Sequence, residues 1–259
     1  MQDLLNQILV GGVYSFFIVF IRLGAALATM PVFGDFFITT RIRLAFAVGF
    51  SLVLTPVLQG TLPPQPTNVI DFSILIGQEF IIGAFIGSIA RFLISALDTA
   101  GMIISFKSGL SNAQIFNPSL GGQGSLVGAF LSITGIMFLF ATNMHHFLIV
   151  TLTESYAYFP VGTLPPSGSM AELLSTVLSR SFEIAFKLSM PFVIVALMIF
   201  VTMGIMARVM PQVQIFLIAL PGQVGVAFLT LALTISAILY YWVDQFEAGL
   251  GYFLTQAVG

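Results

Sequence analysis

The sequence contains no cysteine and very few charged residues. The absence of cysteine excludes disulfides, thiolate metal sites and cysteine nucleophiles. Charged residues make up only 7% of the 259 residues, whereas a soluble domain carries about 25%. The net charge is -2 and no basic run is present, which argues against a nucleic-acid partner. No GxSxG, P-loop or GxGxxG pattern points to an enzyme.

Hydrophobic residues make up 58% of the chain instead. A helix that crosses the hydrocarbon core of about 30 Å needs roughly 20 apolar residues, and its backbone must satisfy its hydrogen bonds within the segment. Six apolar segments approach this length, at about 8–30, 44–58, 70–97, 126–152, 184–206 and 213–241. We therefore expect an all-α integral membrane protein built of helical hairpins, some with broken helices, as one domain over residues 1–259. The first residues lack a signal-peptide pattern, so we expect them to belong to the first helix.

The second and sixth segments depart from a simple membrane span. The second, 44–58, is short for a span. Pro211 and Pro221 bracket the brief apolar run QVQIFLIAL at the start of the sixth. Because a proline deletes a helix hydrogen bond and clashes with the preceding turn, we expect the last segment to begin as a broken or re-entrant piece.

Charge placement predicts an orientation. Basic residues follow the first, third and fifth segments, while five acidic residues lie in or beside the other loops and the C-terminus: Asp71, Glu154, Glu172, Asp244 and Glu247. The basic residues are Arg41, Arg43, Lys107 and Arg208. By the positive-inside rule these three loops face the cytoplasm and both termini face away from it.

Small residues recur at helical spacing in two segments. Gly83 and Gly87 lie in the third segment, and Gly124, Gly128 and Gly135 lie in or next to the fourth. Such spacing lets neighbouring helix backbones approach closely. We expect close helix packing there, either within the chain or on another subunit.

Ionisable residues inside apolar segments need compensation, since each costs roughly 2.5–3.5 kcal/mol at a bilayer centre. They are Arg22, Glu79, Arg91 and Lys187. Glu183 and Lys187 have the i,i+4 spacing of a local ion pair. For Arg22 and Glu79 we favour buried pairing, snorkelling or a subunit contact over a proton or ion pathway.

Two enzyme-like features are weak. Adjacent His145 and His146 point about 100° apart on a helix, so we assign them a polar role at a helix end and expect no metal site. Gly109-Leu110-Ser111 upstream of a histidine is similar, over three residues, to the serine–histidine dyad of rhomboid intramembrane proteases, but Asn112 follows Ser111 where a glycine would match. A small-solute channel or secondary transporter also fits a broken final segment with intramembrane charges, although no inverted repeat is evident.

Four stretches together resemble one protein family. They are PVFGDFFITTRIRLAFAVGFSLVLTP (31–56), DTAGMIISFKSGLSNAQIFNPSLGGQ (98–123), ATNMHHFLIV (141–150) and ARVMPQVQIFLIALPGQVGV (207–226). In this order and spacing they are similar to the FliR family of flagellar type III export-gate proteins, whose injectisome homologues of the SctT and SpaR type share the fold. The chain departs from the family at Met102, where an acid or glutamine is usual, and at Lys107, where glutamine is usual.

The resemblance implies a role without covalent chemistry and without a cofactor. One copy would assemble with FliP-like and FliQ-like membrane subunits into a closed, helical export gate for unfolded flagellar proteins. The gate would lie beside FlhB-like and FlhA-like proteins in the bacterial cytoplasmic membrane, at the flagellar basal body. Much of the chain would be raised out of the bilayer by packing on its neighbours.

The resemblance also implies roles for two sets of residues. The polar connector, 106–124, would contain a plug in the lumen of the gate, beneath methionines supplied by FliP-like subunits, although an ordinary surface loop is the alternative. Its residues are Gly109, Leu110, Ile115, Phe116, Asn117, Pro118, Leu120, Gly121 and Gly122. Leucine, isoleucine and phenylalanine would seal an aqueous path, while glycine and proline permit irregular backbone only where protein or water satisfies it. Subunit packing or partner contact is assigned to Gly83, Gly87, Arg208, Pro211, Gln212, Phe216 and Pro221.

Overall fold

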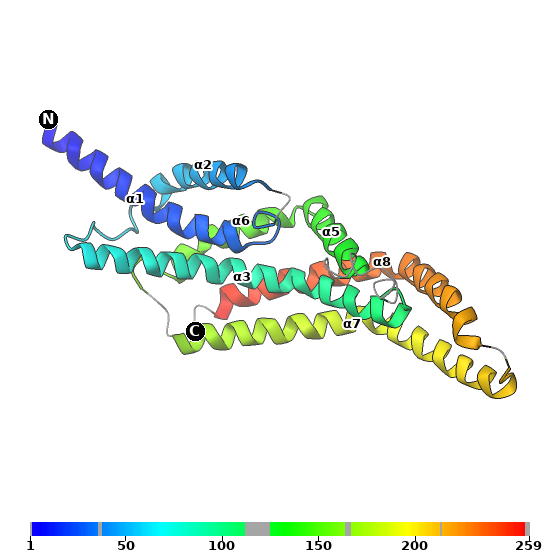
Figure 1. Cartoon of the computed structure of the whole chain (residues 1–259). Helices are drawn as coiled ribbons and strands as arrows, with labels where there is room; N and C mark the ends of the chain where they lie inside the picture. The colour runs from blue at the N-terminus through cyan, green and yellow to red at the C-terminus, as the bar shows by residue number, and fades with distance from the viewer. Residues whose placement is uncertain (1, 36–37, 112–124, 164–166, 213, 257–259) are drawn as a thin grey trace. The chain divides into compact units, whose positions relative to one another are not determined.

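The computed structural model describes residues 2–35, 38–111, 125–163, 167–212 and 214–256, with side chains left out at 2–10, 167, 216–218 and 252–256. The described residues form helices and no strand, which confirms the predicted all-α fold. The helices, drawn in Figure 1, are α1 (Gln2–Thr29), α2 (Thr40–Leu58), α3 (Val69–Ser108), α5 (Leu126–Ala141), α6 (Met144–Tyr158), α7 (Ser167–Val209) and α8 (Ile215–Gln256).

The chain forms two compact units. Unit 1 contains residues 1–93, 143–177 and 248–259, and unit 2 contains residues 94–142 and 178–247. Helices α3, α7 and α8 each contribute residues to both units. The core and the polar contacts of each unit therefore come from segments far apart in the sequence.

Glycines on α3 set the contact between α3 and α1 in unit 1. A Cβ atom on Gly83 would overlap the carbonyl oxygen of Arg22, and one on Gly87 would overlap the hydroxyl of Thr29. The two helices therefore pack with backbone against backbone, as small residues permit. This result places Gly83 and Gly87 in a contact within the chain. The surrounding core is aliphatic and includes the fully buried Ile18, Leu23, Ile82 and Ile86.

The turn after α1 is held by charged side chains. Arg91 of α3 donates from Nε to the carbonyl oxygen of Thr29 at 2.8 Å, and its Nη2 forms an ion pair with Oδ1 of Asp35 at 2.8 Å. The other carboxylate oxygen of Asp35 accepts the backbone N–H of Val32, whose φ is 74°. Arg91 thus satisfies a carbonyl that the helix end leaves without an intrahelical partner.

In unit 2, glycines make a similar close contact, between α3 and α5. A Cβ atom on Gly101 would overlap the backbone of Gly128. Further along α5, a Cβ on Gly135 would overlap a methyl group of Leu97 and lie 3.7 Å from the ring of Trp242. Trp242 of α8 is fully buried, so the space above Gly135 is filled by large side chains of the same unit.

The predicted fourth segment, 126–152, is not one continuous helix. The chain forms two helices there, α5 and α6, separated at Thr142 and Asn143. Asn143 has a φ of 60°, in the left-handed region, which ends a right-handed helix. Hydropathy does not report this break because both flanking stretches are apolar.

Two other expectations also require correction. The second segment is not short, because α2 begins at Thr40 and has 19 residues. Arg43 fits within the first turn of α2 because its side chain donates to the carbonyl oxygens of Phe33 and Asp35. The last segment is not broken at Pro221, which lies inside α8. Pro221 falls in the second turn of that helix, so the hydrogen bond that it deletes lies close to the helix start and the rest of the helix is intact.

The described helices are suited to a membrane. Among the described residues, five helices are long and apolar enough to cross a bilayer, and the α5–α6 pair makes a sixth if it counts as one broken span. This result agrees with the six apolar segments predicted and with an integral membrane protein.

We expect Gly83→Val to destabilise the α1–α3 contact, because the added methyl groups have no space against Arg22. Overpacking of this kind costs about 1–3 kcal/mol. The matched control is Gly77→Val on the same helix, where an added Cβ meets nothing within 4 Å. Thermal unfolding of the purified variants in detergent measures the difference, and equal melting temperatures for the two variants would contradict the close packing.

Candidate functional site

The polar connector between α3 and α5 is the candidate functional segment, and its first end is fixed in unit 2. α3 ends at Ser108, and Gly109 follows with a φ of 77°. A left-handed glycine of this kind commonly terminates a helix. The backbone N–H of Ser111 then donates to the carbonyl oxygen of Ser105 at 3.2 Å, so the connector turns back over the last turn of α3.

Ser125 fixes the other end of the connector. Its hydroxyl accepts the backbone N–H of Gly128 at 3.1 Å, which makes Ser125 the N-cap of α5. The same hydroxyl donates to the carbonyl oxygen of Gly101 at 3.0 Å and lies 2.7 Å from the hydroxyl of Ser105. One buried hydroxyl therefore caps α5 and ties it to α3, and the close approach of Gly101 and Gly128 makes this contact possible.

Helix α8 also contacts the end of α3, where the connector begins. Gln223 of α8 is buried and donates from Nε2 to the carbonyl oxygen of Lys107 at 2.7 Å. That carbonyl belongs to the last turn of α3, where backbone acceptors have no intrahelical partner. The connector thus begins and ends on a base formed by α3, α5 and α8.

An apolar groove of about 580 Å³ adjoins this base. It is lined by Leu110 of the connector, by Leu126, Val127, Ala129, Phe130 and Ile133 of α5, and by Phe228, Leu231, Ala232 and Ile235 of α8. Leu110, one of the predicted sealing residues, therefore lies on hydrocarbon side chains. The groove lining offers no charged group for a polar ligand.

The predicted plug residues are only partly within the described chain. Gly109 and Leu110 are described, at the start of the connector. The remaining plug residues, Ile115, Phe116, Asn117, Pro118, Leu120, Gly121 and Gly122, lie outside the described residues.

The predicted contact residues around the α7–α8 turn are solvent-accessible in the isolated chain. Arg208 is in the last turn of α7, and Pro211 and Gln212 are in the turn that follows. These three residues and Pro221 are exposed, while the side chain of Phe216 lies outside the described residues. The chain itself does not cover this region.

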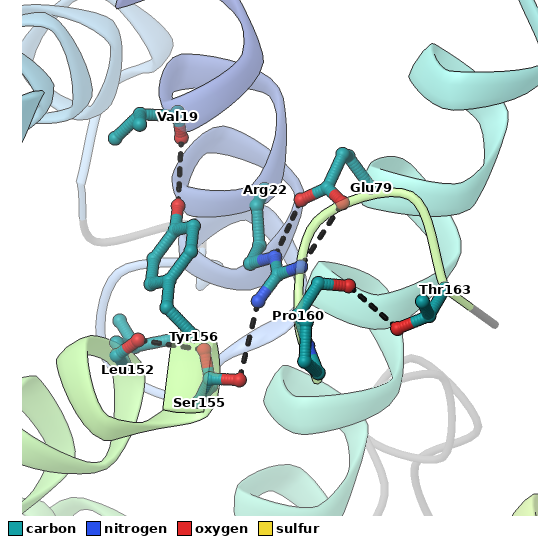
Figure 2. Close-up of polar contacts among 8 residues, drawn as sticks. All are labelled: Val19, Arg22, Glu79, Leu152, Ser155, Tyr156, Pro160 and Thr163. Carbon is teal, nitrogen blue, oxygen red and sulfur yellow. Dashed lines mark hydrogen bonds and ion pairs between the residues drawn. The ribbon is translucent and has the colours of Figure 1, made fainter. Parts of the chain in front are cut away.

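A buried ion pair joins α1 to α3 in unit 1, as Figure 2 shows. Nε of Arg22 donates to Oε2 of Glu79 at 2.6 Å, and Nη2 donates to Oε1 at 3.0 Å. Both side chains are fully buried. The pairing is bidentate, which is the strongest geometry for these two groups. Of the three alternatives that the sequence left open for these residues, namely buried pairing, snorkelling and a subunit contact, the structure shows buried pairing.

Helix α6 completes the environment of Arg22. The third nitrogen, Nη1, donates to the carbonyl oxygen of Ser155 at 3.2 Å, and the guanidinium carbon lies 4.2 Å from the ring centroid of Tyr156. The Tyr156 hydroxyl in turn contacts the carbonyl oxygen of Val19 at 3.4 Å (Figure 2). One arginine therefore holds three helices together, and protein groups replace the water that its charge has lost.

The other polar features singled out in the sequence lie near helix surfaces or ends. Nζ of Lys187 lies 2.6 Å from Oε1 of Glu183, and both side chains are more than half exposed, so the predicted local ion pair is confirmed. His145 and His146 lie in the first turn of α6, which confirms their predicted place at a helix end.

Sequence reasoning missed the groups that hold the connector. Ser125 stands immediately before an apolar run, which is a recognisable N-cap signal. Ser105 and Gln223 carry no such signal, because their partners come from other helices and Gln223 is 116 residues from Lys107 in the sequence.

We expect Arg22→Met to destabilise the protein strongly, because Glu79 then stays buried without a cation. Loss of one partner of a buried pair costs about 3–5 kcal/mol. The double variant Arg22→Met/Glu79→Met removes both charges and is expected to recover much of that loss. Chemical unfolding in detergent measures these effects, with Lys187→Met in the exposed ion pair as a control of small effect. A double variant no more stable than the single one would refute the explanation.

Comparison with known proteins gives a consistent result along the chain. A family model described as bacterial export proteins, family 1, matches residues 13–249. The flagellar biosynthetic protein FliR of Caulobacter vibrioides is 37% identical over 241 residues, which are 93% of this chain and 96% of the relative. FliR of Bacillus subtilis is 30% identical over 229 residues, covering 86% and 87% of the two chains.

An injectisome-related protein is also similar. The Yop proteins translocation protein T of Yersinia pestis is 29% identical over 174 residues, covering 65% of this chain and 67% of the relative. These matches confirm the resemblance to the FliR family and its relation to injectisome proteins. The family match and the two FliR relatives together show that the chain belongs to the bacterial export proteins, family 1.

Proposed function

We propose that this chain is a core membrane subunit of a flagellar type III protein export gate, in the cytoplasmic membrane at the flagellar basal body. The observation that carries the proposal is the similarity to FliR of Caulobacter vibrioides over 93% of this chain and 96% of that protein. A match of this extent includes the connector and most of both units, so the proposal applies to the whole molecule.

Helix length supports a position partly outside the bilayer. Helices α3, α7 and α8 have 40, 43 and 42 residues, and at 1.5 Å per residue each is about 60 Å long. The hydrocarbon core is only about 30 Å thick. Part of each helix must therefore have surroundings other than lipid tails, and neighbouring subunits supply them.

Exposed apolar surface supports a hetero-oligomer. Only 17% of the apolar window of α7 and 22% of that of α8 is buried within the chain, against 61% for α3. Faces that a single chain leaves uncovered are typical of interaction sites. We propose that FliP-like and FliQ-like membrane subunits cover the α7–α8 surface, including Arg208 and Pro211, and that FlhB-like and FlhA-like proteins lie beside the assembly.

The connector supplies the proposed mechanism. Its two ends are fixed on α3 and α5 by Ser105, Ser125 and Gln223, so a change in its conformation need not disturb the helices. The apolar residues of the connector seal an aqueous path in the closed gate, and displacement of the connector opens the path to unfolded flagellar export substrates. The protein makes no covalent bond in this process, and the energy comes from other parts of the export machine.

Co-purification tests the assembly. A tagged chain expressed with the neighbouring export genes and extracted in mild detergent is expected to yield a large complex, with one copy of this chain and several copies of two other small membrane proteins. Arg208→Ala and Pro211→Ala are expected to reduce the yield of that complex. A lone monomer that transports solute after reconstitution would instead establish a transporter and refute the proposal.

Ion leakage tests the connector. Deleting part of 112–122 is expected to raise ion leakage through the assembled gate, because fewer apolar side chains remain to seal the path. The control is a deletion within Pro63-Pro64-Gln65-Pro66, in the loop between α2 and α3. Conductance of the reconstituted gate is the measurement. Leakage that stays at the unmodified level after the connector deletion would exclude the plug role.

A further inference from the structure

Asp98 is an exposed acid in the C-terminal half of α3. The chain has no other charged residue between Arg91 and Lys107. Asp98 is nevertheless accessible on the surface of the helix. A charge in this setting is costly unless it has a partner or water, and such residues usually mark a functional contact.

The position of Asp98 is fixed by α5. Its Oδ1 atom lies 2.5 Å from the point that a Cβ on Gly128 would occupy. Gly128 is in the first turn of α5, so the carboxylate lies beside a helix N-terminus, which favours a negative charge. The side chain of Asp98 therefore lies in a defined place, beside the start of α5.

Within the described part of the chain, no hydrogen bond or ion pair reaches the Asp98 carboxylate. The two carboxylates of Glu79 and Glu183 differ in this respect, since each has a cationic nitrogen at 2.6 Å. The carboxylate of Asp98 is thus open to a group outside the described residues.

Two large apolar side chains lie on the same side of α3 as Asp98. Met102 and Phe106 follow it at intervals of four residues, which places them in one row along the helix. They are 42% and 65% exposed. The adjoining side of α3 already contacts α5, through Gly101 and Ser105.

We infer that the row of Asp98, Met102 and Phe106 binds a helix from another subunit, and that this helix carries a lysine or arginine opposite Asp98. Lipid suits Met102 and Phe106 but not a carboxylate, and water suits the carboxylate but not the two apolar side chains. A partner helix with one cation satisfies all three. The inference rests on the proposed export-gate function and names one contact within that assembly.

Charge variants at Asp98 test the inference in the co-purified complex. Asp98→Lys is expected to reduce the co-purified subunits at least about tenfold, because like charges then face each other across the contact. Asp98→Asn keeps the size and polarity of the side chain and is expected to have a smaller effect in the same direction. The control is Asp71→Lys, an exposed acid in the first turn of the same helix, which is expected to assemble normally.

Cross-linking provides a measurement that does not depend on how Asp98 variants fold. The chain has no cysteine, so Phe106→Cys introduces a unique thiol beside an intact Asp98. We expect this thiol to cross-link to another membrane subunit in the complex, whereas Asp71→Cys is expected to give no such product.

The outcomes separate this inference from the proposed function. If the unmodified chain co-purifies with export subunits while Asp98→Lys assembles equally well, the contact is refuted and the proposed function stands. Phe106→Cys that reacts only with a lipid-dissolved reagent refutes the contact in the same way. If the unmodified chain co-purifies with no export subunit, both the function and the contact are refuted.

Discussion

Close approach of glycine backbones is the contact on which both units depend. In unit 1, Gly83 brings α3 against the backbone of Arg22, and this short separation lets the guanidinium reach Glu79 in a bidentate pair. In unit 2, Gly101 and Gly128 bring α3 against α5, and the hydroxyl of Ser125 then reaches Gly101. A larger side chain at any of these glycines would separate the helices and the polar groups together. The close packing of these helices and the pairing of their polar groups therefore depend on the same glycines.

This constraint connects the fold to the proposed function. In a chain with so little charge, three buried polar side chains make specific links between helices: Arg22 joins three helices, and Ser125 and Gln223 hold the base of the connector. The apolar faces of α7 and α8 are left largely uncovered by the chain. A rigid base with open apolar faces is suited to a subunit that others surround, since the neighbours complete the packing while the connector stays anchored.

Hydropathy predicted the approximate place of the apolar helical segments, but neither their ends nor the division of the fourth segment into two helices. Apolar content cannot detect a single left-handed residue such as Asn143, so the α5–α6 break was missed. Proline was weighed too heavily at Pro221, because one deleted hydrogen bond near the start of a long helix leaves the helix intact. The predicted second segment begins after Arg43, whereas α2 includes Arg43, whose side chain turns back onto backbone carbonyls. In each case a local contact decided the geometry.

The sequence by itself determined the membrane class, the all-α fold, the local pair of Glu183 with Lys187 and the family resemblance. These features depend on composition or on residues close together along the chain, so a linear pattern contains them. Only the tertiary structure decided that Arg22 pairs with Glu79, that Gly101 lies on Gly128 and that Gln223 caps α3. It also decided that Asp98 is presented at the start of α5. The partners in these contacts are separated by 27 to 116 residues of sequence, and no local pattern specifies which distant helix a side chain will meet.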